Sequence, residues 1–252
     1  MRTNPDALIA ETGAVLRPST AATLQEMYTA SHFLGGDDGR ERVANDQAAK
    51  ISPRQGAALH ALVRGFGYRT SLEVGLARGF STAWIMDALA DQPNASHVAI
   101  DPFQRSNWRS VGLHTVNRIG LPVSFRHVEA RSDDALTTLA REGFTVDFVY
   151  IDGNHRFDDV LVDFYLADRI IQPGGLVTLD DMWMPSVRTA VEFIASNRSY
   201  EPVKTAEPNL AAFRKTREDD RPWDHFVPFR VHGPPGGRAA KAWSRVRRLI
   251  AP

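Results

Sequence analysis

Four side chains that can bind a metal ion or accept a proton follow two apolar segments in the second half of the chain. Asp152 and His155 come at the end of the first segment, and Asp180 and Asp181 close the second. If the two segments form neighbouring parallel strands, their carboxyl ends meet at one edge of a sheet. Three carboxylates with one imidazole are costly to place there without a cation. The sequence therefore predicts a cation-binding edge around which the chain is organised.

The elements that would position these residues alternate from residue 70 onward. Short apolar strands are predicted at 71–74, 97–101, 124–128, 147–152 and 176–180. Amphipathic helices are predicted at 81–90, 108–119, 133–141, 158–171 and 186–197. This alternation is typical of a doubly wound α/β fold with a parallel sheet, in which ligands bind beyond the carboxyl ends of the strands. We therefore expect functional residues directly after the strands.

The composition predicts three regions along the chain. They are an N-terminal helical arm and loop at 1–49, a ligand-binding domain at 50–216, and a polar, proline-rich tail with a short basic helix at 217–252. In the arm, a helical pattern at 20–33 precedes a polar, glycine-rich break at 35–42, which we expect to be a flexible loop. Ser52 and Pro53 suit the start of a helix that leads into the first strand. Residues 209–213 are the better candidate for a late antiparallel strand.

The composition also excludes several kinds of partner and site. The 252 residues carry 30 basic and 30 acidic side chains, so no whole-chain field attracts nucleic acid or an anionic membrane. Without cysteine, the chain has no disulfide, zinc–thiolate site or cysteine nucleophile. No run approaches the roughly 18 apolar residues that span a bilayer, and the N-terminus lacks a signal-like apolar region. We expect a cytoplasmic protein.

A glycine-containing turn follows the first predicted strand, in the sequence LEVGLARGFST. Gly75 and Gly79 permit a tight turn and a close approach of a ligand to the main chain, and Glu73 at the strand tip can accept hydrogen bonds. A turn made only for packing would explain the same glycines. The spacing lacks the third glycine of a nicotinamide fingerprint, and no Gly-Lys-Ser/Thr sequence follows to make a Walker loop.

Asp101 ends the second predicted strand, about one strand–helix–strand interval after the glycine turn. A carboxylate at this place can bind both hydroxyls of a ribose. Two acids at adjacent strand tips, with no basic clamp for phosphate, suit a nucleoside that bears a cationic group better than a dinucleotide. S-adenosylmethionine fits that description.

Four ordered motifs, LEVGLARGFST, VAIDPF, FVYIDGNH and PGGLVTLDDM, resemble those of class I S-adenosylmethionine-dependent methyltransferases. Within that superfamily, the chain is similar to the metal-dependent small-molecule O-methyltransferases, which include the catechol, caffeoyl-CoA and macrolide-sugar enzymes. The resemblance covers residues 50–215. It implies a Rossmann-like, mostly parallel seven-stranded sheet, with the arm and the irregular tail outside it.

By position, the resemblance implies two ligand sets. The residues implied for S-adenosylmethionine are Glu73, Gly75, Gly79, Ser81, Asp101, Ser132 and Asp152. The residues implied for a divalent cation, Mg²⁺ by preference, are Asp152, Asp180 and Asp181. Ser132 falls where the family contacts adenine, with Arg131 beside it as a weaker candidate. A helix N-cap would explain Ser132 equally well.

His155 lies three residues after Asp152, where the catechol enzymes have a lysine base and the macrolide-sugar enzymes a histidine. An imidazole with an ordinary pKa of about 6.5 is largely neutral near pH 7, and a nearby cation favours that form further. The implied role of His155 is to remove the proton of a hydroxyl, whose oxygen then attacks the sulfonium methyl. A simple turn-forming role for His155 is the alternative. Asp181 replaces the asparagine of the catechol enzymes, which argues against copying their specificity.

The expected function is metal-dependent methyl transfer to a hydroxyl of a small metabolite, such as a sugar or a natural-product scaffold. Three alternatives stay open: a metal-independent methyltransferase in which His155 acts alone, a related metal-binding hydroxylase-like enzyme, and a non-catalytic S-adenosylmethionine-binding module. Met182, Trp183 and Met184 either form a wall for the acceptor or pack against the arm. Because an arm and a tail that flank a complete core commonly cap a second copy, we expect a homodimer.

Overall fold

The computed structural model describes residues 9, 11–46 and 49–233, and its centre is a sheet of seven strands. The strands are β3 (Thr70–Val74), β4 (Ser96–Ile100), β5 (Ser124–Val128), β6 (Val146–Ile151), β7 (Ile171–Leu179), β8 (Tyr200–Pro202) and β9 (Ala211–Lys215). The surrounding helices are α3 (Pro53–Phe66), α4 (Phe80–Leu89), α5 (Val111–Ile119), α6 (Ser132–Arg141), α7 (Phe157–Ala167) and α8 (Pro185–Asn197). Before them come α2 (Pro18–Thr29), β1 (His32–Gly35) and β2 (Glu41–Ala44).

The strand order is β5-β4-β3-β6-β7-β9-β8, and the five strands from β3 to β7 are parallel to their neighbours. The other two are antiparallel additions, since β9 pairs antiparallel with both β7 and β8. The chain runs outward from β3 to β5 and then returns to place β6 against β3. This reversal creates a switch point between β3 and β6, the place where ligands bind in such sheets. The predicted Rossmann-like, mostly parallel sheet is confirmed.

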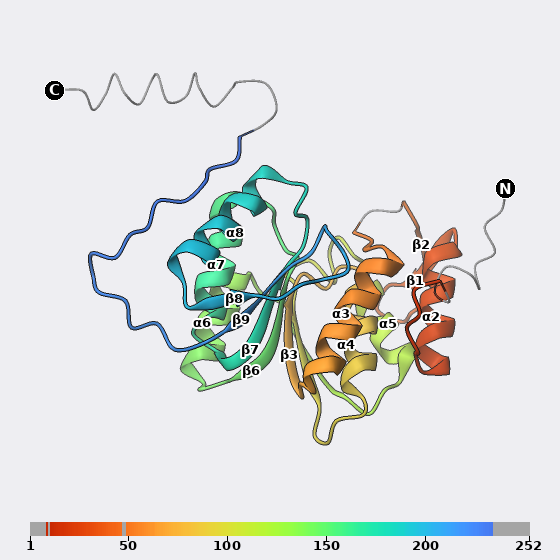
Figure 1. Cartoon of the computed structure of the whole chain (residues 1–252). Helices are drawn as coiled ribbons and strands as arrows, with labels where there is room; N and C mark the ends of the chain where they lie inside the picture. Colours follow the sequence, from red (N-terminus) through yellow and green to blue (C-terminus); the bar gives the residue numbers. More distant parts are fainter. Residues whose placement is uncertain (1–8, 10, 47–48, 234–252) are drawn as a thin grey trace.

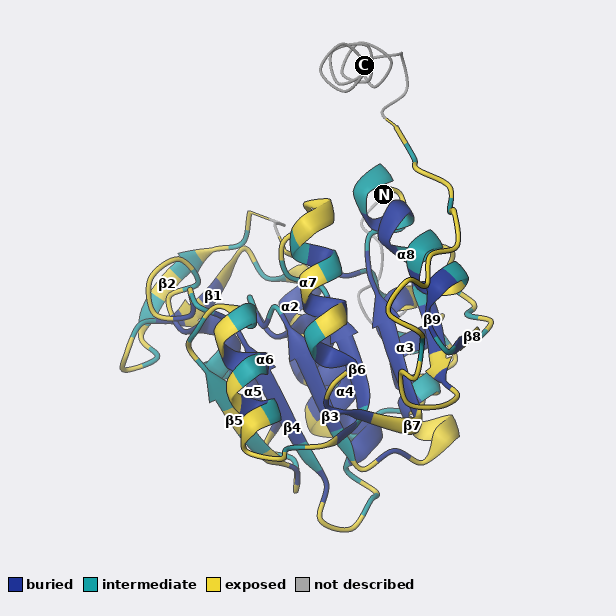
Figure 2. Cartoon of the chain, turned by 90° about the vertical axis from the view of Figure 1, so that its left-hand side faces the viewer, coloured by how far each residue is buried: buried dark blue, intermediate teal, exposed yellow. Residues whose placement is uncertain are grey.

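Helices cover both faces of the sheet, with α3–α5 on one side and α6–α8 on the other (Figure 1). Residues 148–151 of strand β6 are all apolar because the strand is buried on both faces. Phe148 and Tyr150 pack into the core that includes α3–α5, whereas Val149 and Ile151 pack into the core on the opposite face. Strands buried on both faces have no polar alternation, and Figure 2 shows the central strands buried throughout.

The N-terminal region differs from its prediction. Helix α2 ends at Thr29, and the segment expected to contain a flexible loop forms the antiparallel hairpin β1–β2. The hairpin is fixed by remote partners, because Gly36 N donates to the carbonyl of Arg109 at 2.6 Å and the Arg109 guanidinium binds the Glu41 carboxylate. Met27 of α2 belongs to the same core as α3–α5. The division of the chain at residues 49 and 216 stays a prediction.

Other boundaries shift by a few residues for local reasons. Ser52 is the N-cap of α3 as predicted, and its hydroxyl and Gln55 form a reciprocal capping box. Helix α5 begins at Val111 and not at Trp108, because Arg109 and Ser110 have positive φ angles that no α-helix contains. The late strand predicted at 209–213 is β9, two residues further on.

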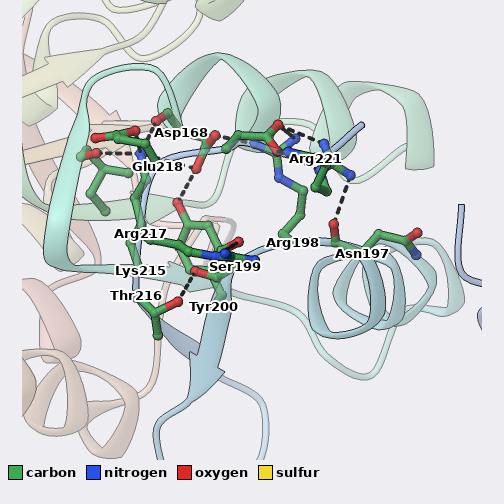
Figure 3. A network of polar contacts seen from close by, with 12 residues as sticks. Asp168, Asn197, Arg198, Ser199, Tyr200, Lys215, Thr216, Arg217, Glu218 and Arg221 are labelled. Carbon is green, nitrogen blue, oxygen red and sulfur yellow. Dashed lines mark hydrogen bonds and ion pairs between the residues drawn. The ribbon is translucent and has the colours of Figure 1, made fainter. Parts of the chain in front are cut away.

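The tail from 217 to 233 is held against α8. The Asn197 amide pairs with both backbone groups of Val227, at 2.9 and 2.8 Å. His232 Nε2 lies 3.1 Å from the Glu192 carboxylate. The network drawn in Figure 3 anchors the start of this segment, with Arg198 bridging Asp168 and Asp219.

The short basic helix that the sequence predicts near the C-terminus lies outside the described residues. Among the described helices, none is long and apolar enough to cross a membrane.

Candidate active site

A cavity of about 670 Å³ lies beyond the carboxyl ends of β3, β4 and β6, at the switch point of the sheet. Its volume is in the range of small-molecule sites. Residues after each of these strands line it, including Gly75 after β3, Asp101 after β4 and Asp152 after β6. The expectation that potential functional residues gather at this edge of the sheet agrees with the structure.

The turn after β3 requires glycine at position 75. Gly75 has φ +99°, and a Cβ there would overlap the carbonyl oxygen of Asp152. The turn therefore packs directly against the end of β6, and its main chain lines the cavity as far as Ala77. Gly79 has φ +81° but is the N-cap of α4 and faces Thr115, so it is not part of the lining.

Glu73 lies behind the cavity and does not line it. Its carboxylate is fully buried and accepts hydrogen bonds from Ser81 Oγ at 2.9 Å and from Thr82 Oγ1. His97 Nε2 lies 3.2 Å away on the other side. The strand's alternation turns this side chain towards α4 and β4, and the predicted role of Glu73 in ligand binding stays a prediction. Ser81, held by Glu73, does line the cavity.

Asp101 lines the cavity and is held by donors from two loops. Its Oδ2 accepts from Ala77 N at 2.7 Å and from Gln104 Nε2 at 3.2 Å, and its Oδ1 accepts from Phe103 N at 2.8 Å. These bonds order the carboxylate and join the glycine turn to the loop after β4.

Ser132 and Arg131 line the cavity beyond β5. Arg131 is the N-cap of α6 and Ser132 its first helical residue, so the predicted N-cap role of Ser132 is wrong. Asp163 on α7 also lines the cavity and is a buried acid that the sequence did not single out. Burial raises the pKa of Asp163 to about 6.

Asp152, His155 and Asp181 form a compact cluster at the other end of the cavity. His155 Nε2 lies 3.3 Å from Asp152 Oδ1 and 2.9 Å from Asp181 Oδ2. One ligand atom from each of the three residues lies within 4.8 Å of the others. The positive φ of Asp181, 59°, turns the chain directly after β7 and Asp180.

Asp180 was expected in this cluster, but its carboxylate is directed into a different set of contacts. Its Oδ1 accepts from Gln55 Nε2 and from Asp181 N, both at 2.7 Å, and from Asn209 Nδ2 at 3.1 Å. Its Oδ2 accepts from the Tyr150 hydroxyl at 2.7 Å. Four donors hold this buried acid between β6, β7 and α3, and it also lines the cavity; its predicted metal-ligand role stays a prediction.

The charges of the cluster are coupled through His155. Hydrogen bonds to Asp152 and Asp181 raise the pKa of His155 to about 10, and the bond to His155 lowers the pKa of Asp181. Burial raises the pKa of Asp152. The sequence predicted a largely neutral imidazole near pH 7; with these partners alone, the ring is protonated there.

Gln55 and Asn209 were missed because neither follows a predicted parallel strand. Gln55 Oε1 accepts from Ser52 N at 2.8 Å while Nε2 reaches Asp180, so the capping-box sequence Ser-x-x-Gln was its only visible signal. Asn209 also contacts Asp181, at 3.3 Å, and its Oδ1 accepts from Trp183 N at 3.2 Å. Both amides line the cavity.

Comparison with known proteins gives matches to methyltransferases. Residues 72–182 match the model of a methyltransferase domain family. A protein of Mycobacterium avium (strain 104) named as an O-methyltransferase is 26% identical over 194 residues, which cover 69% of this chain and 83% of that protein. The structure of an O-methyltransferase from Bacillus cereus with S-adenosylhomocysteine has a TM-score of 0.61 and 20% identity, covering 83% of this chain and 96% of that one. These matches support a class I S-adenosylmethionine-dependent methyltransferase.

A second methyltransferase structure is also similar. TomG from Streptomyces achromogenes, an O-methyltransferase of tomaymycin synthesis solved with S-adenosylmethionine, has a TM-score of 0.59 and 21% identity, with 83% of this chain and 96% of that chain covered.

The residues of this methyltransferase also fit a divalent cation in one arrangement. Asp152 and Asp181 supply carboxylate oxygens, the ligands that Mg²⁺ and Mn²⁺ prefer, and His155 supplies a nitrogen within the same small volume. Asp180, the third carboxylate of the predicted set, lies outside this small volume, where four protein donors hold it.

Proposed function

We propose that this methyltransferase moves the methyl group of S-adenosylmethionine to a hydroxyl oxygen of a small metabolite bound beside His155. The observation that carries the proposal is the continuity of the site. One cavity joins Asp101, which suits a ribose, to a histidine held between two carboxylates, which suits deprotonation of an acceptor. The names of the relatives, which are O-methyltransferases, support oxygen as the attacking atom.

The donor would be bound by residues from four strand ends. We assign Asp101 to the ribose hydroxyls, Ser132 to the adenine, and Gly75 and Ser81 to the methionine part, with Asp152 near the sulfonium. Glu73 and Gly79 support this set from behind: Glu73 accepts from Ser81, and Gly79 begins α4.

His155 would accept the proton of the acceptor hydroxyl. The O–H bond breaks as the proton passes to Nε2; the oxygen then forms a bond to the methyl carbon while the sulfur–carbon bond breaks, and S-adenosylhomocysteine leaves. For this step the imidazole must be neutral, yet Asp152 and Asp181 raise its pKa to about 10. Neutralising those carboxylates would lower the pKa of His155 towards the working range.

We propose that Asp152 and Asp181 hold a divalent cation, Mg²⁺ or Mn²⁺. When bound, the cation lowers the pKa of an acceptor hydroxyl and offsets the negative charge that keeps His155 protonated. This assignment keeps the two carboxylates of the predicted set that lie beside His155, and it explains why two acids flank the proposed base.

The test is methyl transfer from labelled S-adenosylmethionine to a panel of hydroxylated acceptors, with products identified by mass spectrometry. We expect His155→Ala to lower turnover about 100-fold or more, and His232→Ala, which removes a remote histidine–glutamate pair, to leave it unchanged. EDTA should abolish transfer and Mg²⁺ or Mn²⁺ should restore it.

The outcomes separate the alternatives. Full activity in EDTA with loss in His155→Ala would indicate a metal-independent enzyme. Binding of S-adenosylhomocysteine in a calorimeter without methyl transfer to any acceptor would favour a non-catalytic module. Insertion of oxygen into a product would favour a hydroxylase-like enzyme. Absence of cofactor binding would refute the proposal as a whole.

We also propose a homodimer, which size-exclusion chromatography with light scattering measures directly.

A further inference from the structure

Asp181 is held at one carboxylate oxygen and faces the cluster with the other. Its Oδ1 accepts from the Trp183 indole Nε1 at 2.8 Å and from Asn209 Nδ2 at 3.3 Å. Its Oδ2 lies 2.9 Å from His155 Nε2. Because each oxygen of a carboxylate has about two lone-pair positions, the two donors engage Oδ1 and leave Oδ2 as the oxygen that serves the cluster.

Asp152, the other acid of the cluster, has the same arrangement. Its Oδ1 lies 3.3 Å from His155 Nε2, and its Oδ2 lies 3.2 Å from the Tyr150 hydroxyl. The cluster therefore presents one oxygen from each of two carboxylates. Ca²⁺ takes about six to eight oxygen ligands and often binds both oxygens of a carboxylate, whereas Mg²⁺ is octahedral, keeps several waters and uses one or two carboxylates. Single oxygens therefore suit the smaller cation.

The two donors to Oδ1 are fixed by the turn after β7. Asp181 has a φ of 59°, in the left-handed region that residues other than glycine seldom adopt. Asn209 holds this turn, because its carbonyl accepts from Met182 N and its Oδ1 accepts from Trp183 N, both at 3.2 Å. With Oδ1 used in this way, Nδ2 faces the acids and also donates to Asp180 at 3.1 Å.

Trp183 owes little of its position to burial. It is 65% exposed, while its neighbours Met182 and Met184 pack against the core beneath α6–α8. The hydrogen bond to Asp181 therefore orients the indole. Trp183 and Asn209 both lie outside the four sequence motifs, so their contacts with Asp181 arise from the turn and from the segment before β9.

We propose that Trp183 and Asn209 are positioning residues that keep Asp181 Oδ1 occupied and thereby make the site select Mg²⁺ or Mn²⁺ over Ca²⁺. The inference rests on the proposed function, in which Asp152 and Asp181 hold a divalent cation. With Oδ1 engaged, Asp181 offers a cation one oxygen, which is sufficient for an octahedral ion that keeps water and leaves a larger ion short of ligands.

The test compares the affinities of the full-length protein for Mn²⁺ and Ca²⁺, measured by calorimetry at pH 7.5 with S-adenosylhomocysteine in excess. We expect the wild type to bind Mn²⁺ about 30-fold more tightly or better. Trp183→Phe keeps an aromatic ring but removes the N–H, so a lone pair of Oδ1 is released for the larger ion and the ratio should fall to about 5 or less. Asn209→Ala removes the other donor and should lower the ratio as well.

Trp223→Phe is the matched control. It makes the same change at a tryptophan of the tail that is 96% exposed, and it should keep the wild-type ratio. Loss of a donor at Oδ1 also strengthens the attraction of the carboxylate for any cation, but this effect acts on both ions and cancels in the ratio. The affinity for S-adenosylhomocysteine should be the same in every variant. If Asn209→Ala does not fold, Trp183→Phe decides alone, because it leaves the backbone contacts of the turn in place.

The ratio is the decisive measurement because a merely structural role would weaken both cations by the same factor. Equal affinities in the wild type, an unchanged ratio in Trp183→Phe, or an equal fall in Trp223→Phe would each overturn the inference. If the wild type binds S-adenosylhomocysteine but neither cation, the cation assignment of the proposed function is refuted, and the inference with it. Binding of both cations without selection is a distinct result and refutes the inference alone.

Discussion

Lys215 at the end of β9 offers a direct test of what holds the tail and the sheet edge together. Its side chain is 1% exposed, and Nζ donates to the carbonyls of Asp168 at 2.8 Å and Ile171 at 3.0 Å and to the Glu218 carboxylate at 2.6 Å. Figure 3 shows the ammonium at the centre of this network. Because all three acceptors converge on one buried cation, no other described side chain in the network can replace it.

We expect Lys215→Met to destabilise the protein strongly. The change leaves two buried carbonyl oxygens without their donor, at about 1–3 kcal/mol each. The exposed Glu218 contributes little, since pairs in solvent are worth roughly 0–1 kcal/mol. A loss of about 3–5 kcal/mol in the free energy of unfolding, or roughly 10 °C in Tm, is expected.

The measurement is urea unfolding followed by circular dichroism, with Arg217→Met as the matched control. Arg217 also pairs with an acid three residues later, Asp220 at 3.3 Å, but both side chains are 65% exposed. We expect this control to lose less than about 1 kcal/mol. Similar losses in the two variants, or a loss below 1 kcal/mol for Lys215→Met, would refute the reasoning that burial gives the contact its value.

Two further variants test the pocket wall, and a third, Gly65→Ala, is a control outside it. Burial raises the pKa of Asp163 from 3.8 to about 6, so between these values the folded state binds more protons than the unfolded one and stability falls as pH rises. The free energy of unfolding of Asp163→Asn should therefore be about 2 kcal/mol higher than that of the wild type at pH 8. Thermal scans should show that this difference vanishes by pH 4. Gly75→Ala should cost about 3 kcal/mol or prevent folding, because its Cβ would overlap the Asp152 carbonyl. Gly65→Ala, with open space around the new methyl, should raise Tm slightly.

Local pattern was sufficient for much of the fold. The apolar run of β6 predicts a strand buried on both faces, and the glycine at position 75 predicts a turn where a carbonyl approaches the main chain. Both signals arise within a few residues, so they are readable without knowledge of partners. The hairpin β1–β2 was not readable in this way, because its polar segment is ordered by Arg109 and His114, which lie far along the chain.

The acidic residues of the site show the limit of what the sequence predicts. It predicts that Asp152, Asp180, Asp181 and His155 follow two strands and meet at one edge if those strands are parallel neighbours, and the parallel pairing of β6 with β7 confirms that condition. Only the tertiary structure decided that the Asp180 carboxylate accepts a hydrogen bond from Gln55, 125 positions earlier, and that the Asp181 carboxylate lies beside His155. Which way a carboxylate points depends on donors brought together by folding and on the backbone angle at Asp181, and neither is written in the spacing of the motif.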